Sequence, residues 1–274
     1  MTRESPPMPS TTAGDVWSSA LSEYVAAERA AGRSAGTIRL HRHYLRHLAA
    51  QVRAPYSVTL AQLDRYLAHG GWSPETRKSA RGSLASFYRW AARMGYVDEQ
   101  LADRLPHVHV PEGRPRPAPE TVLAAALRVA DHRTRLMLLL AAHAGLRCSE
   151  VSRVHSDDLV GRTLYVTGKG GKTRTVPVLR PELVAAIATA DGWLFPGRTS
   201  GHLAASTVTA LLSDALPGGW TGHTLRHRFA TRAYAGTSDL LAVGELLGHS
   251  RPETTKRYVL VPDEHLAAAV AAAA

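Results

Sequence analysis

The stretch that decides the organisation of the chain is Val110-Pro111-Glu112-Gly113-Arg114-Pro115-Arg116-Pro117-Ala118-Pro119. Its four prolines and one glycine cannot continue a helix or a central strand, because proline lacks the backbone N–H and clashes with the preceding helical turn. The stretch therefore predicts an extended linker between two domains. We expect a flexible tail at 1–14, a first domain at 15–106, the linker at 107–119 and a second domain at 120–274.

The sequence before the linker has the spacing of helices. Trp17, Leu21, Tyr24 and Val25 recur at intervals of three and four residues, which is the period of one helix face. Ser73-Pro74-Glu75 is a typical helix start, with a capping hydroxyl, a proline in the first turn and an acid near the positive end of the helix dipole. The first domain is predicted to be a bundle of about four helices.

Beyond the linker the pattern changes period once. Residues 120–144 predict one long helix that Gly145 stops by taking the left-handed conformation. Residues 163–178 form two β-type runs around Gly168-Lys169-Gly170-Gly171-Lys172, which predicts a hairpin. Helices resume to the end of the chain. The predicted fold class is mainly α with a small antiparallel β-sheet, and the second domain is mixed α+β.

Composition excludes several classes of protein. The 274 residues are 45% hydrophobic and 20% charged, as in ordinary globular proteins. One cysteine, Cys148, rules out a disulfide scaffold and a cysteine-cluster metal site. The beginning lacks an apolar signal core, and the longest strongly apolar stretch, 136–142, is far too short to span a bilayer. We expect a cytoplasmic protein without a membrane partner.

The charge balance has two interpretations. Lys and Arg total 33 against 23 Asp and Glu, a net charge of +10. Such an excess favours a nucleic-acid partner. Only four of the cations are lysines, however, and an arginine- and alanine-rich chain is also what a GC-rich genome produces without selection for binding.

Several residues near the carboxyl end suit phosphoryl transfer. His223 and Arg226 are three apart and share a helix face, and Arg147 lies at a helix junction with Glu150 close enough to orient it. Guanidinium forks match the non-bridging oxygens of a phosphodiester and keep their proton. A tyrosine such as Tyr258 becomes a nucleophile only with a base and a positive field.

The proton chemistry also has candidates. His223 and His249 can exchange protons near neutral pH, and Lys169 on the hairpin turn is suited to protonating a leaving 5′ hydroxyl. The sequence contains no convergent set of carboxylates for Mg²⁺, so we expect cations to replace the metal, with no metal and no cofactor. Taken singly, each of these residues is more often found on a surface or in a core.

Their order and adjacency resemble the tyrosine recombinase (phage integrase) family. The matching segments are Ala144-Gly145-Leu146-Arg147-Cys148-Ser149-Glu150, Gly168-Lys169-Gly170-Gly171-Lys172-Thr173-Arg174, His223-Thr224-Leu225-Arg226-His227-Arg228-Phe229-Ala230-Thr231, Leu246-Leu247-Gly248-His249-Ser250 and Thr254-Thr255-x-x-Tyr258. The resemblance is strong from Glu120 to about Pro262 and weak before the linker. Gly222 and Val259 depart from residues common in the family, at positions outside the catalytic set.

The resemblance implies a role for each residue. Tyr258 would attack the scissile phosphate to give a 3′-phosphotyrosine, while Arg147 and Arg226 hold its non-bridging oxygens. His223 and His249 would assist proton transfer, and Lys169, with Lys172 as the weaker rival, would be the general acid. Glu150 and His227 would support these groups, and neither ATP nor a metal would be required.

The resemblance also implies how the chain meets DNA. The first domain would be a helical, SAM-like core-binding domain, and the two domains would clamp duplex recombination sites as in the simple, Xer-like two-domain members. The predicted DNA contacts are Arg39, Arg42, Arg46, Arg77, Lys78, Arg81, Lys172 and Arg174. We expect a homo-tetramer on two paired sites, joined through the C-terminal segment 263–274, with an accessory directionality factor or a second recombinase as a further partner.

The biological role has several interpretations. Integration and excision of a phage or mobile element is the first, and chromosome-dimer resolution of the Xer type is the alternative. A non-catalytic DNA-binding regulator on the same scaffold is the alternative from another class, and the complete catalytic set argues against it. A relaxing topoisomerase of the related IB type would instead nick DNA without partner sites.

Overall fold

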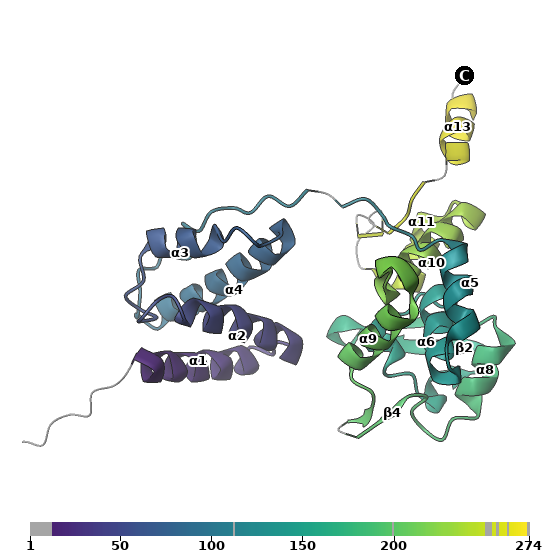
Figure 1. Ribbon diagram of the computed structural model, residues 1–274, viewed down its shortest axis with the longest axis horizontal. Coiled ribbons are helices and arrows are strands. Elements are labelled where there is room, and N and C mark those ends of the chain that lie inside the picture. The colour runs from purple at the N-terminus through teal and green to yellow at the C-terminus, as the bar shows by residue number, and fades with distance from the viewer. Residues whose placement is uncertain are drawn as a thin grey trace, which may run out of the picture. The chain divides into compact units, whose positions relative to one another are not determined.

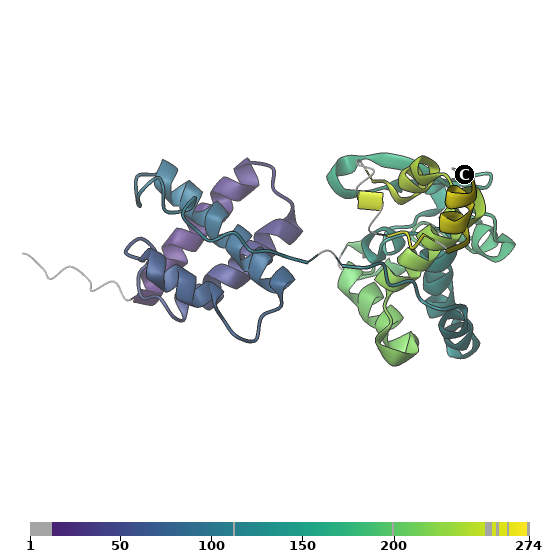
Figure 2. The same ribbon diagram turned by 90° about the horizontal axis from the view of Figure 1, so that it is seen from above.

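The computed structural model describes residues 13–111, 113–198, 200–249, 254–255, 258–261 and 263–272. The chain divides into two units, Met1–Glu112 and Gly113–Ala274, and the division falls inside the proline-rich stretch (Figures 1 and 2). Each unit has a hydrophobic core of its own. The predicted fold class, mainly helical with a small antiparallel sheet, is confirmed.

The first unit consists of helices, namely α1 (Ala13–Ala30), α2 (Ala35–Ala49), α3 (Leu60–Leu67) and α4 (Pro74–Arg93). Helices α2, α3 and α4 each begin at a capping hydroxyl. The side chains of Ser34, Thr59 and Ser73 accept hydrogen bonds from the backbone N–H groups of the first turns of α2, α3 and α4. The helix start predicted at Ser73-Pro74-Glu75 is therefore confirmed.

Aromatic side chains hold these helices together. The rings of Trp17 on α1 and Phe87 on α4 stack with centroids 5.9 Å apart, and Tyr24 meets Phe87 edge-to-face at 5.3 Å. The buried indole N–H of Trp17 donates to the carbonyl of Val52 at 2.7 Å, so burying the ring leaves no unsatisfied donor there.

The second unit is helical around two small sheets. Its helices are α5 (Glu120–Val129), α6 (His132–His143), α7 (Cys148–Val151), α8 (Pro181–Ala188), α9 (Ala205–Ala215), α10 (Gly222–Thr237), α11 (Leu240–Leu247) and α13 (Asp263–Ala272), with 3₁₀ turns at Ser156–Asp158, Lys169–Gly171 and Pro217–Gly219. Its strands are β1 (Leu159–Val160), β2 (Thr163–Thr167), β3 (Thr173–Pro177), β4 (Pro196–Gly197) and β5 (Gly201–His202).

The single helix predicted over 120–144 is wrong. The structure has α5 and α6 there, separated at Ala130, whose ψ of 138° is extended, and Asp131 caps α6 by accepting from the N–H of Thr134 at 2.7 Å. The apolar pattern is continuous through this point, so helical periodicity alone hides the break.

The predicted hairpin is confirmed as β2 and β3. They pair antiparallel, with Leu164 opposite Val176, and β1 joins the other edge of β2. Gly170 and Gly171 turn the chain between the strands at φ values of 79° and 75°, which favour glycine. This turn carries the backbone of Lys169.

Helix α6 lies at the centre of the second core. All side chains from Leu136 to Ala142 are buried, and α10 packs along α6 (Figure 1). Arg228 on α10 donates to the carbonyl of Ala142 at 3.1 Å. Within the described ranges, no helix has the length and apolar character needed to cross a bilayer.

Candidate active site

The turn after α6 brings Arg147, the first of the two predicted catalytic arginines, close to α10. Gly145 has a φ of +64°, as predicted for a residue that stops the helix. A Cβ there would lie 2.5 Å from Cδ1 of Phe229 on α10, so only glycine allows this approach. Arg147 follows at the start of α7 with a side chain that is 33% exposed. Its guanidinium is therefore partly open to a ligand.

Glu150 is the buried acid that orients the surrounding arginines. Its side chain is 1% exposed. It accepts from the Arg147 backbone N–H at 2.9 Å and from Arg147 Nη1 at 2.8 Å. Arg174 binds both of its oxygens through Nη1 and Nη2, each at 2.9 Å. Burial alone would raise the pKa of Glu150, but the Arg174 fork, the Arg147 N–H and both positive charges outweigh burial and hold the pKa at about 2.

Arg226 lies deepest in the site. Its side chain is 1% exposed, and Nη1 donates to the carbonyl of Gly145. Its Nη2 donates to the carbonyl of Leu247 at 2.5 Å, and Nη1 lies 3.8 Å from Glu150 Oε2. Burial and the neighbouring charge of Arg147 lower the pKa of Arg226. The hydrogen bonds hold its guanidinium in one place on the floor of the site.

His249 follows the left-handed cap of α11. Gly248 ends the helix with a φ of 64°. Arg226 Nη2 lies 3.3 Å from His249 Nε2, and Thr255 Oγ1 lies 3.1 Å from His249 Nδ1. Because a guanidinium only donates, Nε2 is the acceptor and Nδ1 carries the proton toward Thr255. Partial burial, then the charges of Arg226 and Arg147, lower the pKa of His249 to about 4.

Two further histidines lie one turn apart on α10. The Nε2 atoms of His223 and His227 are 3.0 Å apart. His223 is exposed and His227 is buried. Burial, followed by the neighbouring His223 and Arg226, lowers the pKa of His227 to about 4. Partial burial, followed by the charges of Arg226 and Arg147, lowers the pKa of His223.

The ring of Tyr258 lies among these groups. It stacks on His227 with centroids 4.5 Å apart, and it lies 4.7 Å from His249 and 5.3 Å from His223. The guanidinium carbon of Arg226 is 5.6 Å from its centroid. A phenol therefore shares one site with neutral imidazoles and a fixed positive charge, which is the requirement for an activated tyrosine nucleophile.

The structure thus brings together most of the predicted catalytic set, namely Arg147, Glu150, His223, Arg226, His227, His249 and Tyr258. The side chain of Lys169 lies outside the described residues, so its predicted role as general acid stays a prediction. Lys172, after the glycines of the same turn, is exposed.

The comparisons with known proteins agree with this geometry. The model of the phage integrase family matches residues 119–265, more than half of the chain. The chain belongs to the phage integrase family. The segments that carried the resemblance all lie inside the matched range.

Relatives of this integrase-family chain are named tyrosine recombinases. It is 31% identical to the tyrosine recombinase XerD of Caulobacter vibrioides, with 93% of this chain and 94% of the relative covered. It is 36% identical to the tyrosine recombinase XerC of Rhodospirillum centenum, with 73% and 66% covered. This protein is accordingly a site-specific tyrosine recombinase.

Solved structures share its fold. A lambda integrase dimer bound to a COC′ core site matches with a TM-score of 0.71 at 19% identity, covering 88% of this chain and 76% of the other. The Tn1549 transposon integrase in complex with a circular intermediate DNA matches with a TM-score of 0.63 at 21% identity, covering 93% and 99%.

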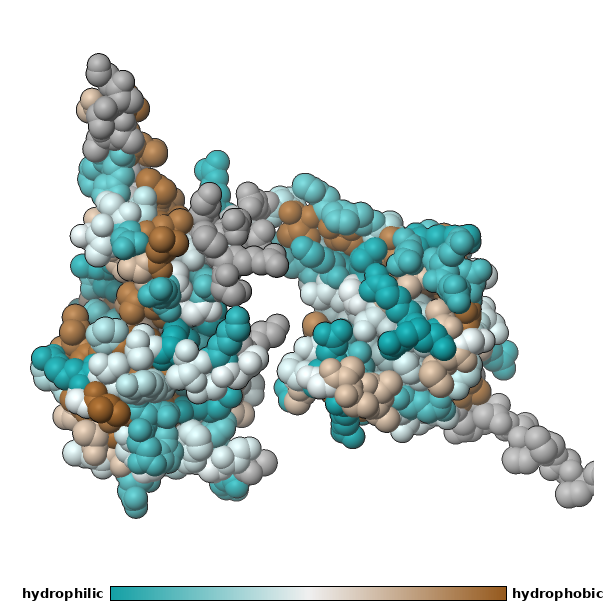
Figure 3. All heavy atoms as spheres, turned by 180° about the vertical axis from the view of Figure 1, so that it is seen from behind, coloured by the Kyte–Doolittle hydropathy of each residue, from teal (hydrophilic) through white to brown (hydrophobic). Residues whose placement is uncertain are grey.

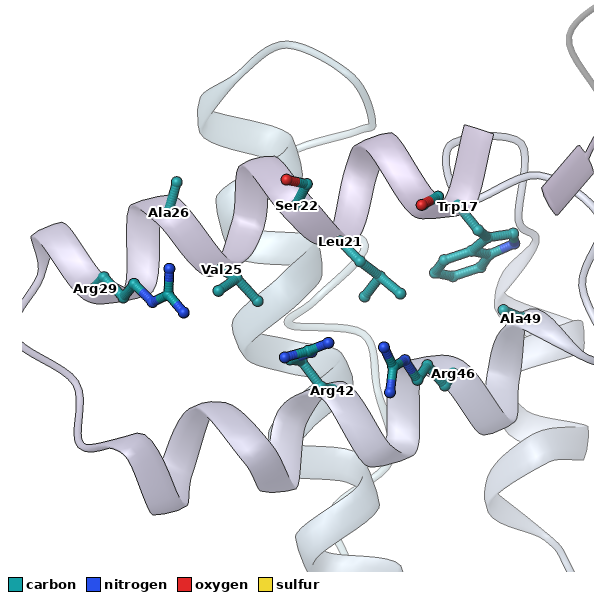
Figure 4. Close-up of a pocket in the computed structure, with 10 residues that line it drawn as sticks. Trp17, Leu21, Ser22, Val25, Ala26, Arg29, Arg42, Arg46 and Ala49 are labelled. Carbon is teal, nitrogen blue, oxygen red and sulfur yellow. The ribbon is translucent and has the colours of Figure 1, made fainter. Parts of the chain in front are cut away.

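The first unit of this family member has a basic groove between α1 and α2. The groove has a volume of about 630 Å³. Figure 4 shows Arg42 and Arg46 reaching from α2 toward α1, where Leu21 and Val25 line the opposite wall. A neighbouring hollow adds Arg33 and Arg39, and no Asp or Glu is among the residues that line either one. Arg39, Arg42 and Arg46, three of the predicted DNA contacts, therefore line a surface that attracts anions.

The predicted DNA contacts on α4 are Arg77, Lys78 and Arg81, and two of them bond to backbone carbonyls. Arg81 donates from Nε to the carbonyl of Pro106 and from Nη2 to that of Leu105, both at 3.2 Å. Arg77 donates to the carbonyl of His69 at 3.5 Å, and Lys78 is exposed. Two of these three cations therefore also hold the backbone of their own unit.

Sequence reasoning missed some members of these surfaces. Arg29 on α1 lines the basic groove, and Arg33 in the turn after α1 lines the neighbouring hollow. Their spacing of four residues was the available signal. Thr255, the partner of His249, was quoted within a motif but received no role. Arg174 was predicted as a DNA contact, although its nitrogens bind Glu150 and the carbonyl of Leu246.

Proposed function

We propose that this protein cleaves and rejoins duplex DNA at specific sites, with Tyr258 as the nucleophile. The observation that carries the proposal is the position of the Tyr258 ring between His223, His227 and His249, with the buried Arg226 guanidinium 5.6 Å from its centroid.

The cleavage step balances without a cofactor. The Tyr258 oxygen forms a bond to phosphorus while the bond from phosphorus to the 5′ oxygen breaks, which leaves a 3′-phosphotyrosine and a 5′ hydroxyl. The phenolic proton passes to the neutral imidazole of His223, because Nε2 of His249 already accepts a hydrogen bond from Arg226. Lys169 protonates the departing 5′ oxygen. A 5′ hydroxyl from the partner strand then attacks the phosphotyrosine, so the energy of the diester is conserved.

The arginines stabilise the charge that develops on phosphorus. Arg147 and Arg226 hold the non-bridging oxygens, and their positions are fixed before the DNA binds, because Glu150 and backbone carbonyls already hold both guanidiniums. Preorganised positive groups of this kind account for about 10²–10³-fold in rate for each group removed. Cleavage in EDTA at the same rate as in its absence is therefore expected.

The remaining cations bind the DNA backbone. The proposed phosphate contacts are Arg39, Arg42, Arg46, Arg77, Lys78, Arg81 and Lys172. Contacts of this kind set affinity and register but do not read sequence. The basic groove between α1 and α2 supports the α2 contacts most directly.

Strand exchange requires two paired sites, which we propose are held by a tetramer in the nucleoid. The C-terminal segment supplies the contact between subunits. Leu260, Val261, Leu266 and Val270 expose apolar side chains on α13 and the chain before it, and Figure 3 shows this hydrophobic surface. Removing 263–274 should spare DNA binding and abolish coordinated cleavage, and undiminished recombination by the truncated chain would contradict the assignment.

Integration and excision of a mobile element is the proposed biological role, with a directionality factor as an accessory partner. Chromosome-dimer resolution, alone or with a second recombinase, is a second candidate, which the XerC and XerD names of the relatives favour. The DNA beside the gene tests the choice, because an attachment-like repeat there supports integration.

The decisive experiment traps the covalent intermediate. Nicked duplexes that tile the DNA flanking the gene are incubated with the full chain, and a protein–DNA adduct is sought on a denaturing gel. Tyr258→Phe should bind DNA with similar affinity and give no adduct, and Tyr234→Phe, a tyrosine of the same unit, should give the adduct as before. An adduct that persists in Tyr258→Phe would overturn the proposal, and its loss in Tyr234→Phe would identify Tyr234 as the nucleophile.

A further inference from the structure

Each of the three guanidinium nitrogens of Arg174, on β3, donates a hydrogen bond inside the protein. Its side chain is 11% exposed. Nη1 and Nη2 bind the two oxygens of Glu150 at 2.9 Å each, and Nε donates to the carbonyl of Leu246 at 2.7 Å. A phosphate could reach only the second hydrogen of Nη1 or Nη2, on a side chain that is almost wholly buried. Lys172, two residues before Arg174, is by contrast exposed to solvent.

The bond to Leu246 fixes the end of α11. The carbonyls of Leu246 and Leu247 are consecutive acceptors there, the first bound by Arg174 and the second by Arg226 at 2.5 Å. The carboxyl end of a helix carries partial negative charge, so two guanidiniums at this end stabilise it and are themselves held in place.

The stem of Arg174 also packs against the turn that presents His249. A Cβ at Gly248 would lie 3.0 Å from Cδ of Arg174 and 3.1 Å from its Nη1. Gly248 has a φ of 64° and directly precedes His249. The arginine stem therefore lies where any other residue at this turn would place its side chain.

We propose that Arg174 is a positioning residue that sets the places of Arg226 and His249 by joining Glu150 to the end of α11, rather than a DNA contact. This proposal rests on the proposed function, because Arg226 and His249 are the groups it positions. Three elements distant in sequence, α7, β3 and α11, meet at this one side chain. The hairpin is thereby tied to the histidine turn.

Lysine cannot reproduce the arrangement. A guanidinium offers planar donors in a fork that matches a carboxylate while a third nitrogen reaches the carbonyl, whereas an ammonium is a point charge on a flexible stem. Arg174→Lys preserves charge and most of the volume but loses the fork. A misplacement of catalytic groups by about 1 Å typically lowers rate about 10²-fold.

The test separates rate from affinity in the full chain. Single-turnover cleavage is measured at saturating nicked duplex, and affinity is measured by anisotropy as a function of salt. We expect Arg174→Lys to lower the saturated rate about 10²-fold, with Kd within about threefold and an unchanged salt dependence. Arg135→Lys is the matched control, since Arg135 binds Glu182 through Nε at 2.7 Å and Nη2 at 3.5 Å away from the site, and it should leave the rate unchanged.

The opposite result, in which affinity falls and the cleavage rate does not, would overturn the proposal. A saturated rate within about threefold of the parent chain, with weaker binding and a salt slope reduced by about one, identifies a phosphate contact. If Arg174→Lys melts at a much lower temperature than the parent chain, cleavage by Arg174→Ala is measured with added guanidinium instead. A cleavage rate that guanidinium restores no better than methylammonium does would overturn the proposal. An adduct missing from the parent chain, or persisting in Tyr258→Phe, would instead contradict the proposed function.

Discussion

Replacing Glu150 by glutamine removes the one carboxylate that the guanidiniums of Arg147 and Arg174 bind in the site. The volume hardly changes, so the effect isolates charge and hydrogen bonding. A glutamine keeps one acceptor oxygen, but its amide nitrogen then faces arginine donors. Those guanidiniums and that of Arg226 would repel one another in a buried site without a counter-charge.

The size of the destabilisation expected for Glu150→Gln follows from the pKa of Glu150. A pKa of about 2 for Glu150, against its ordinary value of 4.5, corresponds to about 3 kcal/mol of stability at neutral pH. Because the folded-state pKa is the lower one, this stabilisation is fully present above about pH 4.5 and is lost as pH falls toward 2. Breaking one side of a buried ion pair typically costs about 3–5 kcal/mol, which agrees. We expect Glu150→Gln to destabilise the second unit by about 3 kcal/mol at pH 7, and by less at pH 3.5.

The assay is urea unfolding of the full chain, with hydrogen exchange of peptides from α6 reporting on the second unit. Glu182→Gln is the matched control, because Glu182 also pairs with an arginine, Arg135, but is 34% exposed. Such a pair contributes about 0–1 kcal/mol. A Glu150→Gln chain as stable as the parent at pH 7, or a difference that does not shrink at low pH, would refute the reasoning.

Three further predictions concern His249, the glycine turn after α6, and the arginines of the first unit. Since the pKa of His249 is about 4 and neutral imidazole is the active form, the cleavage rate should stay level from pH 7 to about 5 and fall toward 4; half-loss near pH 6.5 would contradict this. Gly145→Ala should lower the melting temperature more than Gly161→Ala, because both require positive φ but only Gly145 lies against Phe229; calorimetry compares them. Arg42→Ala should reduce the salt slope of DNA binding by about one, and Arg81→Ala by less, because backbone carbonyls already hold Arg81; equal slopes would refute the difference.

Local features of this fold could be predicted from sequence because each depends on a few neighbouring residues. Ser73 caps its helix through a bond three residues away, and Gly145 and Gly248 end helices by a backbone freedom that only glycine has in full. The hairpin likewise follows from alternation and two turn glycines. The catalytic residues were predicted from their order along the chain, with the resemblance supplying their roles.

The partners of those residues could not be predicted in the same way. Arg174 lies 24 residues from Glu150 and 72 from Leu246, so nothing local distinguishes it from an exposed basic residue on a hairpin. The break at Ala130 was hidden because α5 and α6 both bury apolar faces, and only the cap at Asp131 marks it. In both cases the deciding contact is made by tertiary packing.

The charge balance of the cluster explains why these long-range contacts matter. Arg147, Arg174 and Arg226 contribute three positive charges and Glu150 one negative charge, a sum of +2. A phosphodiester carries one negative charge, and its pentavalent transition state carries two. In the proposed cleavage reaction the cluster therefore matches the transition state better than the ground state, and only differential stabilisation of that kind accelerates a reaction. Without Glu150 the three cations would repel one another. Without Arg174 the acid would draw more heavily on Arg147 and Arg226, the two arginines that we propose hold the phosphate.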